Sequence, residues 1–390
     1  MRRIFSVESY KLRYYHDLPN LRNSILEETR MKRIILAFTV TLWLLAIIDN
    51  TSSLQRNSSD RIVYIGYANK VAFSPTGDRL AVKSINTISI FDTTNFEPAV
   101  EIENITTKVD WGWPDTSEDA MALDWNQNGS LLAVPVLDVW MSINIWDTST
   151  VSVKKLDQED VGAITSIDWH PQNNILAISA SRTTYQDEPA WVIRLMDTQI
   201  TNYYDSLRVF GGSYARITDI AWHPDGIWLA SSDNNGAIKL WNTSDPDIEK
   251  TNTDANFKGS FLNTYKSNGY PTINDLTWSP SGSFLASANG DSTITIRKFD
   301  AGEYPLSFFT NLEGHFGSVL AIDWNSDGTL LASAGEDAII RIWNVEFGEV
   351  IATFEGHQAA IHDLDWSPDD KWIITAGRDK TVRIWKVDLP

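Results

Sequence analysis

Two histidines, His315 and His357, have the neighbours that acid–base catalysis would require. After 18, 4 and 6 residues, each is followed by a hydroxyl residue, an aspartate and a tryptophan, namely Ser333, Asp337 and Trp343 or Thr375, Asp379 and Trp385. A hydroxyl, an imidazole and a carboxylate are the parts of a nucleophilic triad. Because the two sets have identical spacing, we interpret them as one structural unit that occurs twice.

Other groups that could do chemistry are sparse. The chain has no cysteine, which excludes disulfides and thiolate metal sites, and it has no G-x-S-x-G, H-E-x-x-H or P-loop motif. His170 and His223 each precede a proline, and we expect both on the surface of turns. His362 follows His357 by five residues without a supporting set of carboxylates. We therefore expect no catalytic residue, no metal and no cofactor.

The charge of the chain is negative and unevenly distributed. The formal net charge is −19, of which residues 1–60 carry +3 and the remainder −22. A body this acidic repels phosphate backbones, so we expect no nucleic-acid partner. The scattered Asp and Glu residues are interpreted as a solvated acidic surface.

These residues lie within a pattern that recurs seven times. A short apolar strand ends in an aromatic residue, a turn such as SPSGS or NSDGT follows, and strands such as LLAS and IRIW come next. The shortest repeat intervals match the 40–45 residues of a four-stranded propeller blade. The aromatic residues that end the seven first strands are Phe73, Trp125, Trp169, Trp222, Trp278, Trp324 and Trp366.

The last two copies resemble complete WD repeats. They read EGHFGSVLAIDWNSDGTLLASAGEDAIIRIWN and EGHQAAIHDLDWSPDDKWIITAGRDKTVRIWK, with the Gly-His and closing Trp of that family. The resemblance covers residues 61–390 and implies an all-β fold, a seven-bladed β-propeller of four-stranded antiparallel blades around a central channel. It also implies that the N-terminal strand Arg61–Ile65 completes the last blade and closes the ring, which removes an exposed sheet edge.

The same resemblance gives the two histidine sets a structural role. In WD repeats, His, Ser or Thr, Asp and Trp form a hydrogen-bonded tetrad in which buried polar groups satisfy one another. The tetrad is incomplete in earlier copies. Blade four has Ser231 and Trp241 with Ser213 and Asn235, blade five has Ser287 and Asp291 with Gly269 and Arg297, and blade three has Met196 in place of Trp.

The N-terminal region differs from the repeats. Residues 34–48 are almost wholly apolar, follow Lys32 and Arg33, and precede a polar stretch, which is the layout of a secretory signal peptide. Fifteen residues are fewer than the roughly 20 of a usual membrane-spanning helix. We therefore expect residues 1–48 to be an export or anchor segment, with Met31 a possible start, residues 49–60 a polar linker, and residues 61–390 the propeller.

This arrangement predicts a propeller outside the cytoplasm, either secreted or tethered to the membrane through 34–48, with a cytoplasmic location as the alternative. We expect a monomeric, non-enzymatic scaffold for protein–protein interaction. In the family, loops that lead into the first strands gather on one face, and aromatic and Arg side chains often dominate interfaces. Here those loops carry Trp111, Trp113, Tyr214, Arg216, Tyr270, Phe316 and His362.

Two other functions are open. A glycan-binding propeller is suggested by four tryptophans that the repeat does not explain, namely Trp111, Trp113, Trp140 and Trp191. An enzyme on a propeller scaffold would need clustered acid, base or metal-binding residues, and no such motif occurs. Trp111 and Trp113 have a further interpretation, in which they fold back onto the blades and contribute to stability.

Overall fold

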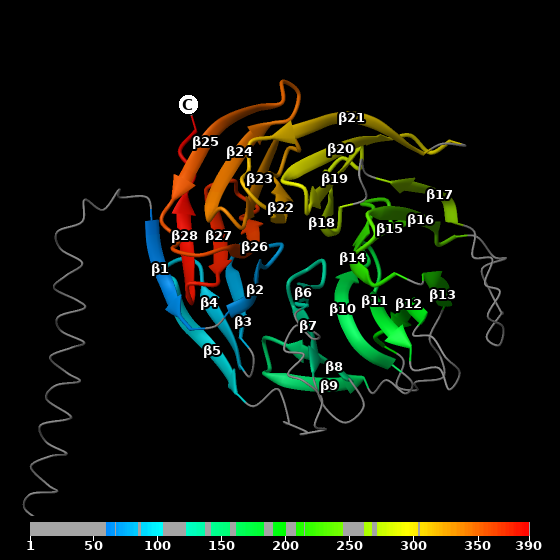
Figure 1. The fold of residues 1–390 in the computed structure, drawn as a ribbon. Coiled ribbons are helices and arrows are strands. Elements are labelled where there is room, and N and C mark those ends of the chain that lie inside the picture. Colours follow the sequence, from blue (N-terminus) through cyan, green and yellow to red (C-terminus); the bar gives the residue numbers. More distant parts are fainter. Residues whose placement is uncertain are drawn as a thin grey trace, which may run out of the picture. The chain divides into compact units, whose positions relative to one another are not determined.

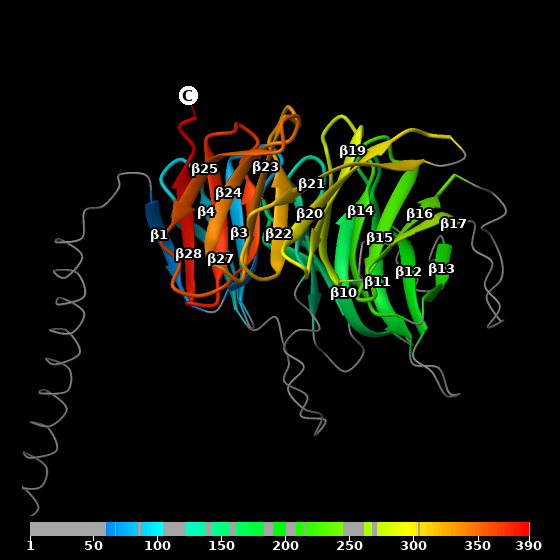
Figure 2. The ribbon, with the colours of Figure 1, turned by 45° about the horizontal axis from the view of Figure 1, so that its top comes forward.

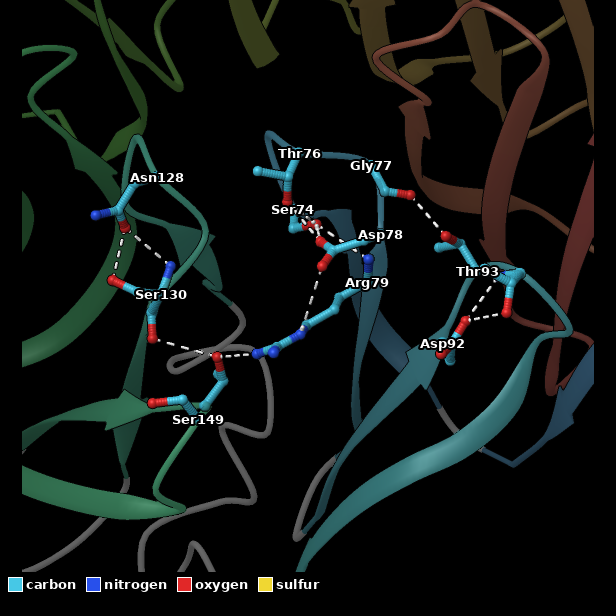
Figure 3. Close-up of polar contacts among 12 residues, drawn as sticks. Ser74, Thr76, Gly77, Asp78, Arg79, Asp92, Thr93, Asn128, Ser130 and Ser149 are labelled. Carbon is cyan, nitrogen blue, oxygen red and sulfur yellow. Dashed lines mark hydrogen bonds and ion pairs between the residues drawn. The ribbon is translucent and has the colours of Figure 1, made fainter.

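In most repeats, the turn between the first two strands contains short polar residues and a glycine. In the first copy, Gly77 has a φ of 72° and its N–H donates to the carbonyl of Ser74 at 2.7 Å. The Ser74 hydroxyl donates to the carboxylate of Asp78 at 2.9 Å (Figure 3). A positive φ has no steric penalty at glycine, so this sequence reverses the chain tightly.

The computed structural model describes residues 60–66, 68–84, 87–103, 122–136, 142–156, 161–182, 190–199, 208–213, 215–244, 261–266, 271–302 and 305–389. Within these ranges all regular secondary structure is β-strand. They belong to one compact unit, Ser59–Pro390.

The strands form four-stranded antiparallel sheets in which neighbours in sequence are neighbours in space. The first three sheets contain β2 (Ala68–Phe73), β3 (Arg79–Ser84), β4 (Thr87–Asp92) and β5 (Glu97–Glu103); β6 (Asp124–Trp125), β7 (Leu131–Val136), β8 (Ser142–Asp147) and β9 (Ser152–Leu156); and β10 (Val161–Trp169), β11 (Ile175–Arg182), β12 (Ala190–Asp197) and β13 (Arg208–Ser213).

The following three sheets repeat this order. They contain β14 (Ile217–Trp222), β15 (Trp228–Asp233), β16 (Ala237–Asn242) and β17 (Phe261–Lys266); β18 (Ile273–Trp278), β19 (Phe284–Asn289), β20 (Thr293–Phe299) and β21 (Leu306–Glu313); and β22 (Val319–Trp324), β23 (Leu330–Gly335), β24 (Ile339–Asn344) and β25 (Glu349–Glu355).

The remaining sheet joins the two ends of the repeat region. It contains β26 (Ile361–Trp366), β27 (Trp372–Gly377) and β28 (Thr381–Lys386), and its outer strand is β1 (Asp60–Ile65). In the antiparallel pairing of β1 with β28, Asp60 lies opposite Trp385 and Ile65 opposite Thr381. The segment before the first repeat thus supplies the fourth strand of the last sheet.

The sheets stand side by side with their first strands innermost (Figure 1). Seen at a different tilt, the sheets stand as neighbouring, upright layers (Figure 2). The core lies between adjacent sheets and is not confined within any single one. Leu331 and Trp343 of one sheet, for example, pack against Ala286 and Ile294 of its neighbour, and all four are almost fully buried. Full burial of one such aliphatic side chain stabilises the fold by about 1.5–3 kcal/mol.

The predicted export or anchor segment, 34–48, and the predicted linker up to residue 59 lie outside the described residues. In the ranges that the structure does describe, no helix is long and apolar enough to cross a membrane.

Candidate functional site

The histidine set on β22–β24 forms a continuous hydrogen-bonded chain. The Nε1–H of Trp343 donates to Ser333 Oγ at 2.7 Å, and Ser333 Oγ lies 2.7 Å from His315 Nε2. On the other side of the ring, His315 Nδ1 lies 3.0 Å from Asp337 Oδ2. Arg341 donates to the same carboxylate oxygen at 2.7 Å, which adds a charged partner.

The set on β26–β28 has the same geometry. The Nε1–H of Trp385 donates to Thr375 Oγ1 at 2.8 Å, Thr375 Oγ1 lies 2.7 Å from His357 Nε2, and His357 Nδ1 lies 2.9 Å from Asp379 Oδ2. An ionised carboxylate only accepts hydrogen bonds, so His357 Nδ1 carries the proton and donates. In the neutral ring Nε2 then accepts from Thr375, whose oxygen accepts from Trp385.

The lowered pKa values of Asp337 and Asp379 favour this direction of the hydrogen bonds, from histidine to carboxylate. Burial opposes ionisation of Asp337, but hydrogen bonds from His315, the N–H of Phe316 and Arg341 outweigh it and hold the pKa of Asp337 well below its usual range. Burial likewise opposes ionisation of Asp379, and the N–H of Gln358, the Thr381 hydroxyl and His357 together lower its pKa. Both carboxylates therefore stay charged as acceptors.

This geometry does not suit a nucleophilic triad. The Ser333 and Thr375 side chains are 0% exposed, so no substrate carbonyl can approach their hydroxyls. Each hydroxyl already accepts from a tryptophan and donates to a histidine. The arrangement can satisfy buried polar groups and fix backbone, but it cannot attack a substrate.

The tetrads fix the loops that lead into the first strands. The carboxylate of Asp337 accepts the backbone N–H of Phe316 at 3.2 Å, and that of Asp379 accepts the N–H of Gln358 at 2.9 Å. Phe316 is 82% exposed although its backbone is held in this way. The tetrad thus presents a large apolar side chain to solvent on a rigid loop.

The other predicted partner-binding residues are placed differently. Trp111, Trp113, Tyr214 and Tyr270 lie outside the described residues. The guanidinium of Arg216 lies over the ring of Trp191, 5.9 Å from its centroid. His362 is half-buried, and its Nε2 donates to the carbonyl of Ala68 at 2.6 Å. Of the predicted set, Phe316 is therefore the described side chain that is plainly available to a partner.

The incomplete sets keep only part of the tetrad. The Nε1–H of Trp241 donates to Ser231 Oγ at 2.9 Å, which preserves the strand-to-strand link without a histidine. Ser287 Oγ donates to the carbonyl of Thr295 at 3.4 Å, and Met196 is buried in the core. The position of Gly269 lies outside the described residues.

The expectation that His170 and His223 lie on the surface was wrong. They are 6% and 7% exposed, and their Nε2 atoms lie 3.0 Å from the carbonyls of Gly226 and Gly282 in the corresponding turns of the next sheet. Each imidazole fills the space beside a glycine, since an added Cβ at Gly226 would lie 2.4 Å from His170. These histidines therefore join neighbouring sheets.

Sequence reasoning also missed a set of aspartates on the innermost strands. In the part of the chain that the structure describes, seven of them accept a backbone N–H from the first strand of the adjacent sheet at 2.5–2.8 Å. The interpretation of the acidic residues as a solvated surface is wrong for these side chains. They are Asp124, Asp168, Asp219, Asp275, Asp323, Asp363 and Asp365.

Several of these carboxyl groups form pairs between adjacent sheets. Asp124 is hydrogen-bonded to Asp168, and Asp323 to Asp365. Burial raises the pKa of Asp124 to about 7 and that of Asp323 to about 6. Burial, together with the negative charge of the partner, raises the pKa values of Asp168 and Asp365 well above the usual range. Each pair therefore shares a proton near neutral pH.

One cation lies among these carboxylates. Lys70 on β2 occupies the position where three other first strands have Asp219, Asp275 and Asp363, and its Nζ lies 2.7 Å from Asp363 Oδ1. Desolvation opposes its charge, but the charges of Asp363 and Asp275 raise the pKa of Lys70 above its usual range. Among the described residues, no cluster of three or more His, Cys, Asp or Glu side chains is arranged to hold a metal ion.

The comparisons with known proteins agree with the repeat pattern. The family model described as WD domain, G-beta repeat (WD40) matches residues 204–242, 259–297, 306–344 and 348–386. The β-propeller domain of Cps50 (Swd1) from Myceliophteria thermophila superposes with a TM-score of 0.63 over 84% of this chain and 100% of that one. At 15% sequence identity this likeness shows the fold alone.

Curated relatives match over shorter stretches. Cell division cycle 20.1, cofactor of APC complex, from Arabidopsis thaliana is 26% identical over 215 residues, which are 54% of this chain and 41% of that protein. Target of rapamycin complex subunit wat1 from Schizosaccharomyces pombe is 32% identical over 111 residues, 28% and 30% of the two chains. The chain thus spans less than half the length of these relatives. Four segments of the chain therefore match the WD repeat, and the fold of the chain is that of a β-propeller.

Proposed function

We propose that this protein is a non-enzymatic scaffold that binds protein partners through the face presented by its tetrad-anchored loops. The observation that carries the proposal is Phe316, an exposed aromatic side chain whose backbone is held by the buried Asp337. A rigid loop loses little conformational entropy on binding, and aromatic side chains contribute strongly to interfaces. The tetrad histidines serve this role indirectly, because they hold the loop in place.

The proposed scaffold is a closed ring of seven blades, the propeller domain extending over residues 61–390. The pairing of β1 with β28 supports closure, since it leaves no unpaired edge on β28. The contact between β2 and β26 supports it as well, because these innermost strands come from opposite ends of the repeat region. We propose that the propeller is a monomer, since its acidic surface disfavours self-association.

The names of the relatives support a role in protein assemblies. They include a cofactor of the APC complex and a subunit of a target of rapamycin complex. The name of another relative, probable cytosolic iron-sulfur protein assembly protein Ciao1 from Culex quinquefasciatus, supports the cytoplasmic alternative over export. Fractionation of cells that express the full chain tests this, because a cytoplasmic protein appears in the cytosol with residues 1–60 intact.

Glycan binding and catalysis receive no such support. Trp111, Trp113 and Trp140 lie outside the described residues, and one face of Trp191 is occupied by Arg216. The hydroxyls of Ser333 and Thr375 are buried.

Affinity purification with the full chain tests the proposed face. Proteins retained by the wild-type chain are expected to be lost from Phe316→Ala, and also from the double variant Trp111→Ala, Trp113→Ala. The matched control is Ile227→Ala, because Ile227 is 42% exposed in the turn between β14 and β15, away from the tetrad loops. Equal retention by the folded Phe316→Ala variant and the control would show that the face is wrong.

A further inference from the structure

Large apolar side chains are exposed on the outer strands of two adjacent sheets. Phe308 and Phe309 of β21 are 61% and 40% exposed, and Phe347, in the turn between β24 and β25, is 69% exposed. Val350 and Ile351 of β25 are each 41% exposed. These five residues are called the lateral patch. None of them belongs to the loops that lead into first strands, so the lateral patch is separate from the proposed partner face.

The two strands meet at the lateral patch. Gly348 follows Phe347, and a Cβ added there would lie 3.9 Å from Leu312 and 4.0 Å from Thr310, both on β21. Thr310 is two residues from Phe308 along the strand. In Figure 1, β21 and β25 are the outer strands of neighbouring sheets. The turn that carries Phe347 therefore rests on β21, the strand that carries Phe308 and Phe309.

A β-bulge in each outer strand explains why two consecutive apolar residues are exposed. Arg297 pairs with Phe308 and Ile296 with Thr310, which leaves Phe309 without a partner. Trp343 pairs with Val350 and Ile342 with Ala352, which leaves Ile351 unpaired in the same way. A bulge interrupts the alternation of a strand and re-aims its side chains. It also disrupts the outer edge, which disfavours docking by simple strand addition.

The size and charge of the lateral patch identify its occupant. Its exposed apolar area is on the order of 400 Å², which is the size of the largest apolar patch on a typical monomer, a patch that is often functional, and is small for a stable subunit interface. Glu346 and Glu349 adjoin Phe347 and Val350 in sequence, and neither forms an ion pair among the described residues. A second copy of the chain is disfavoured by the net charge of −19.

We propose that the lateral patch binds a short segment of a partner protein in which large apolar side chains are flanked by Lys or Arg. The apolar side chains cover Phe308 and Phe347, and the basic side chains pair with Glu346 and Glu349. The site is independent of Phe316, so the protein contacts partners on two surfaces.

Binding of labelled synthetic peptides to the full chain tests the proposal. The probe carries Phe and Leu flanked by Lys, an acidic peptide replaces each Lys with Glu, and a polar peptide replaces each Phe and Leu with Ser. Fluorescence anisotropy is expected to show at least tenfold tighter binding of the probe than of either other peptide. The double variant Phe308→Ser, Phe347→Ser should weaken probe binding at least tenfold, and Glu346→Gln with Glu349→Gln at least threefold.

Controls separate the lateral patch from general effects. Val153→Ser changes a side chain that is 48% exposed on β9, and it should leave probe binding within twofold of the wild type. Phe316→Ala should also leave it unchanged, which distinguishes this site from the proposed partner face. Circular dichroism establishes that each variant is folded. The proposal is overturned by equal probe binding to the patch variant, by equal binding of the polar peptide, or by a wild-type dimer that the patch variant loses.

Discussion

At the scale of single residues, the same side chains can serve catalysis or structure, and burial decides between them. The tetrad of His357 contains the groups of a hydrolase triad, but its hydroxyl is inaccessible and already has two hydrogen-bond partners. Its value lies in satisfying polar groups that would otherwise be buried without partners. This chain of hydrogen bonds ends at Asp379, whose carboxylate accepts the backbone N–H of Gln358 and so holds the loop that leads into β26.

Replacing His357 with Ala is expected to lower the free energy of unfolding by roughly 1–3 kcal/mol, because Thr375 and Asp379 lose their shared partner. Urea denaturation followed by tryptophan fluorescence measures the change. Gln358→Ala, which changes an exposed neighbour, is the control and should have little effect. A loss below about 0.5 kcal/mol for His357→Ala would contradict the structural role.

Gly226 gives a second prediction at this scale. Its φ is 72°, and an added Cβ would lie 2.4 Å from the ring of His170. Gly226→Ala should therefore cost roughly 1–3 kcal/mol in the free energy of unfolding. In a His170→Ala background the clash is absent, so the cost should fall to that of the backbone strain alone. Gly302→Ala is the control, because no atom lies within 4 Å of a Cβ added there.

At the scale of elements, the innermost strands are tied to one another by carboxylates. Each tie runs from an aspartate on one first strand to a backbone N–H on the next, as from Asp168 to Trp222. These side-chain hydrogen bonds link first strands of adjacent sheets, which do not pair with one another through their backbones. They also bring carboxyl groups of adjacent strands together, which makes the stability of the sheet-to-sheet contacts depend on pH.

The carboxyl pairs predict stability that falls as the pH rises from about 4 to 7. Unfolded aspartates have a pKa near 3.9, whereas those of Asp323 and Asp124 are about 6 and about 7 in the folded chain. Folding therefore takes up protons in this range, and the stabilisation is full below about pH 4 and is lost as the pH passes through 6 and 7. Thermal unfolding at a series of pH values measures this dependence.

In stronger acid the opposite trend is expected, because the pKa values of Asp337 and Asp379 are lowered in the folded chain. Their contribution is present above about pH 4 and is lost below it.

Asp168→Asn tests the carboxyl pairs directly, since an amide can donate to Asp124 at any pH. This variant should flatten the profile between pH 5 and 8 and raise stability at pH 8 by roughly 1 kcal/mol. An unchanged profile would show that the pair does not share a proton.

At the scale of the whole molecule, the last sheet depends on a strand from the opposite end of the repeat region. Without β1, β28 would have an unpaired edge, and unpaired edges invite aggregation. The register between Asp60 opposite Trp385 and Ile65 opposite Thr381 spans most of β28. The stability of the repeats as a whole therefore depends on residues that precede them.

Deleting residues 1–66 is expected to lower the melting temperature by roughly 5–10 °C, because about 3 kcal/mol of pairing and burial is lost. It should also promote aggregation through the bare edge of β28. Deleting residues 1–58, which keeps β1, is the matched control and should melt like the full chain. Equal melting temperatures for the two truncated chains would contradict the proposed ring closure.

Much of this architecture could be predicted from local sequence. Each sheet forms by hairpins between neighbouring segments, so its signals recur along the sequence at matching positions. They include the strand ends at Trp324 and Trp366, turn residues such as Gly77, and the spacing from His315 to Trp343. The pairing of Arg61–Ile65 with the last repeat is not local, and only the resemblance to WD repeats implied it. Hairpin chemistry is local, so a single chain is enough to recognise it.

Contacts between sheets could not be predicted in this way. Asp124 and Asp168 lie far apart in sequence, as do His170 and Gly226, and each pair meets across two sheets. Which side chains meet there depends on how the packed sheets are rotated and spaced, not on turn residues or alternation. The sequence by itself determined the sheets, and only tertiary packing decided which aspartates share a proton, which histidines are buried and where apolar side chains remain exposed.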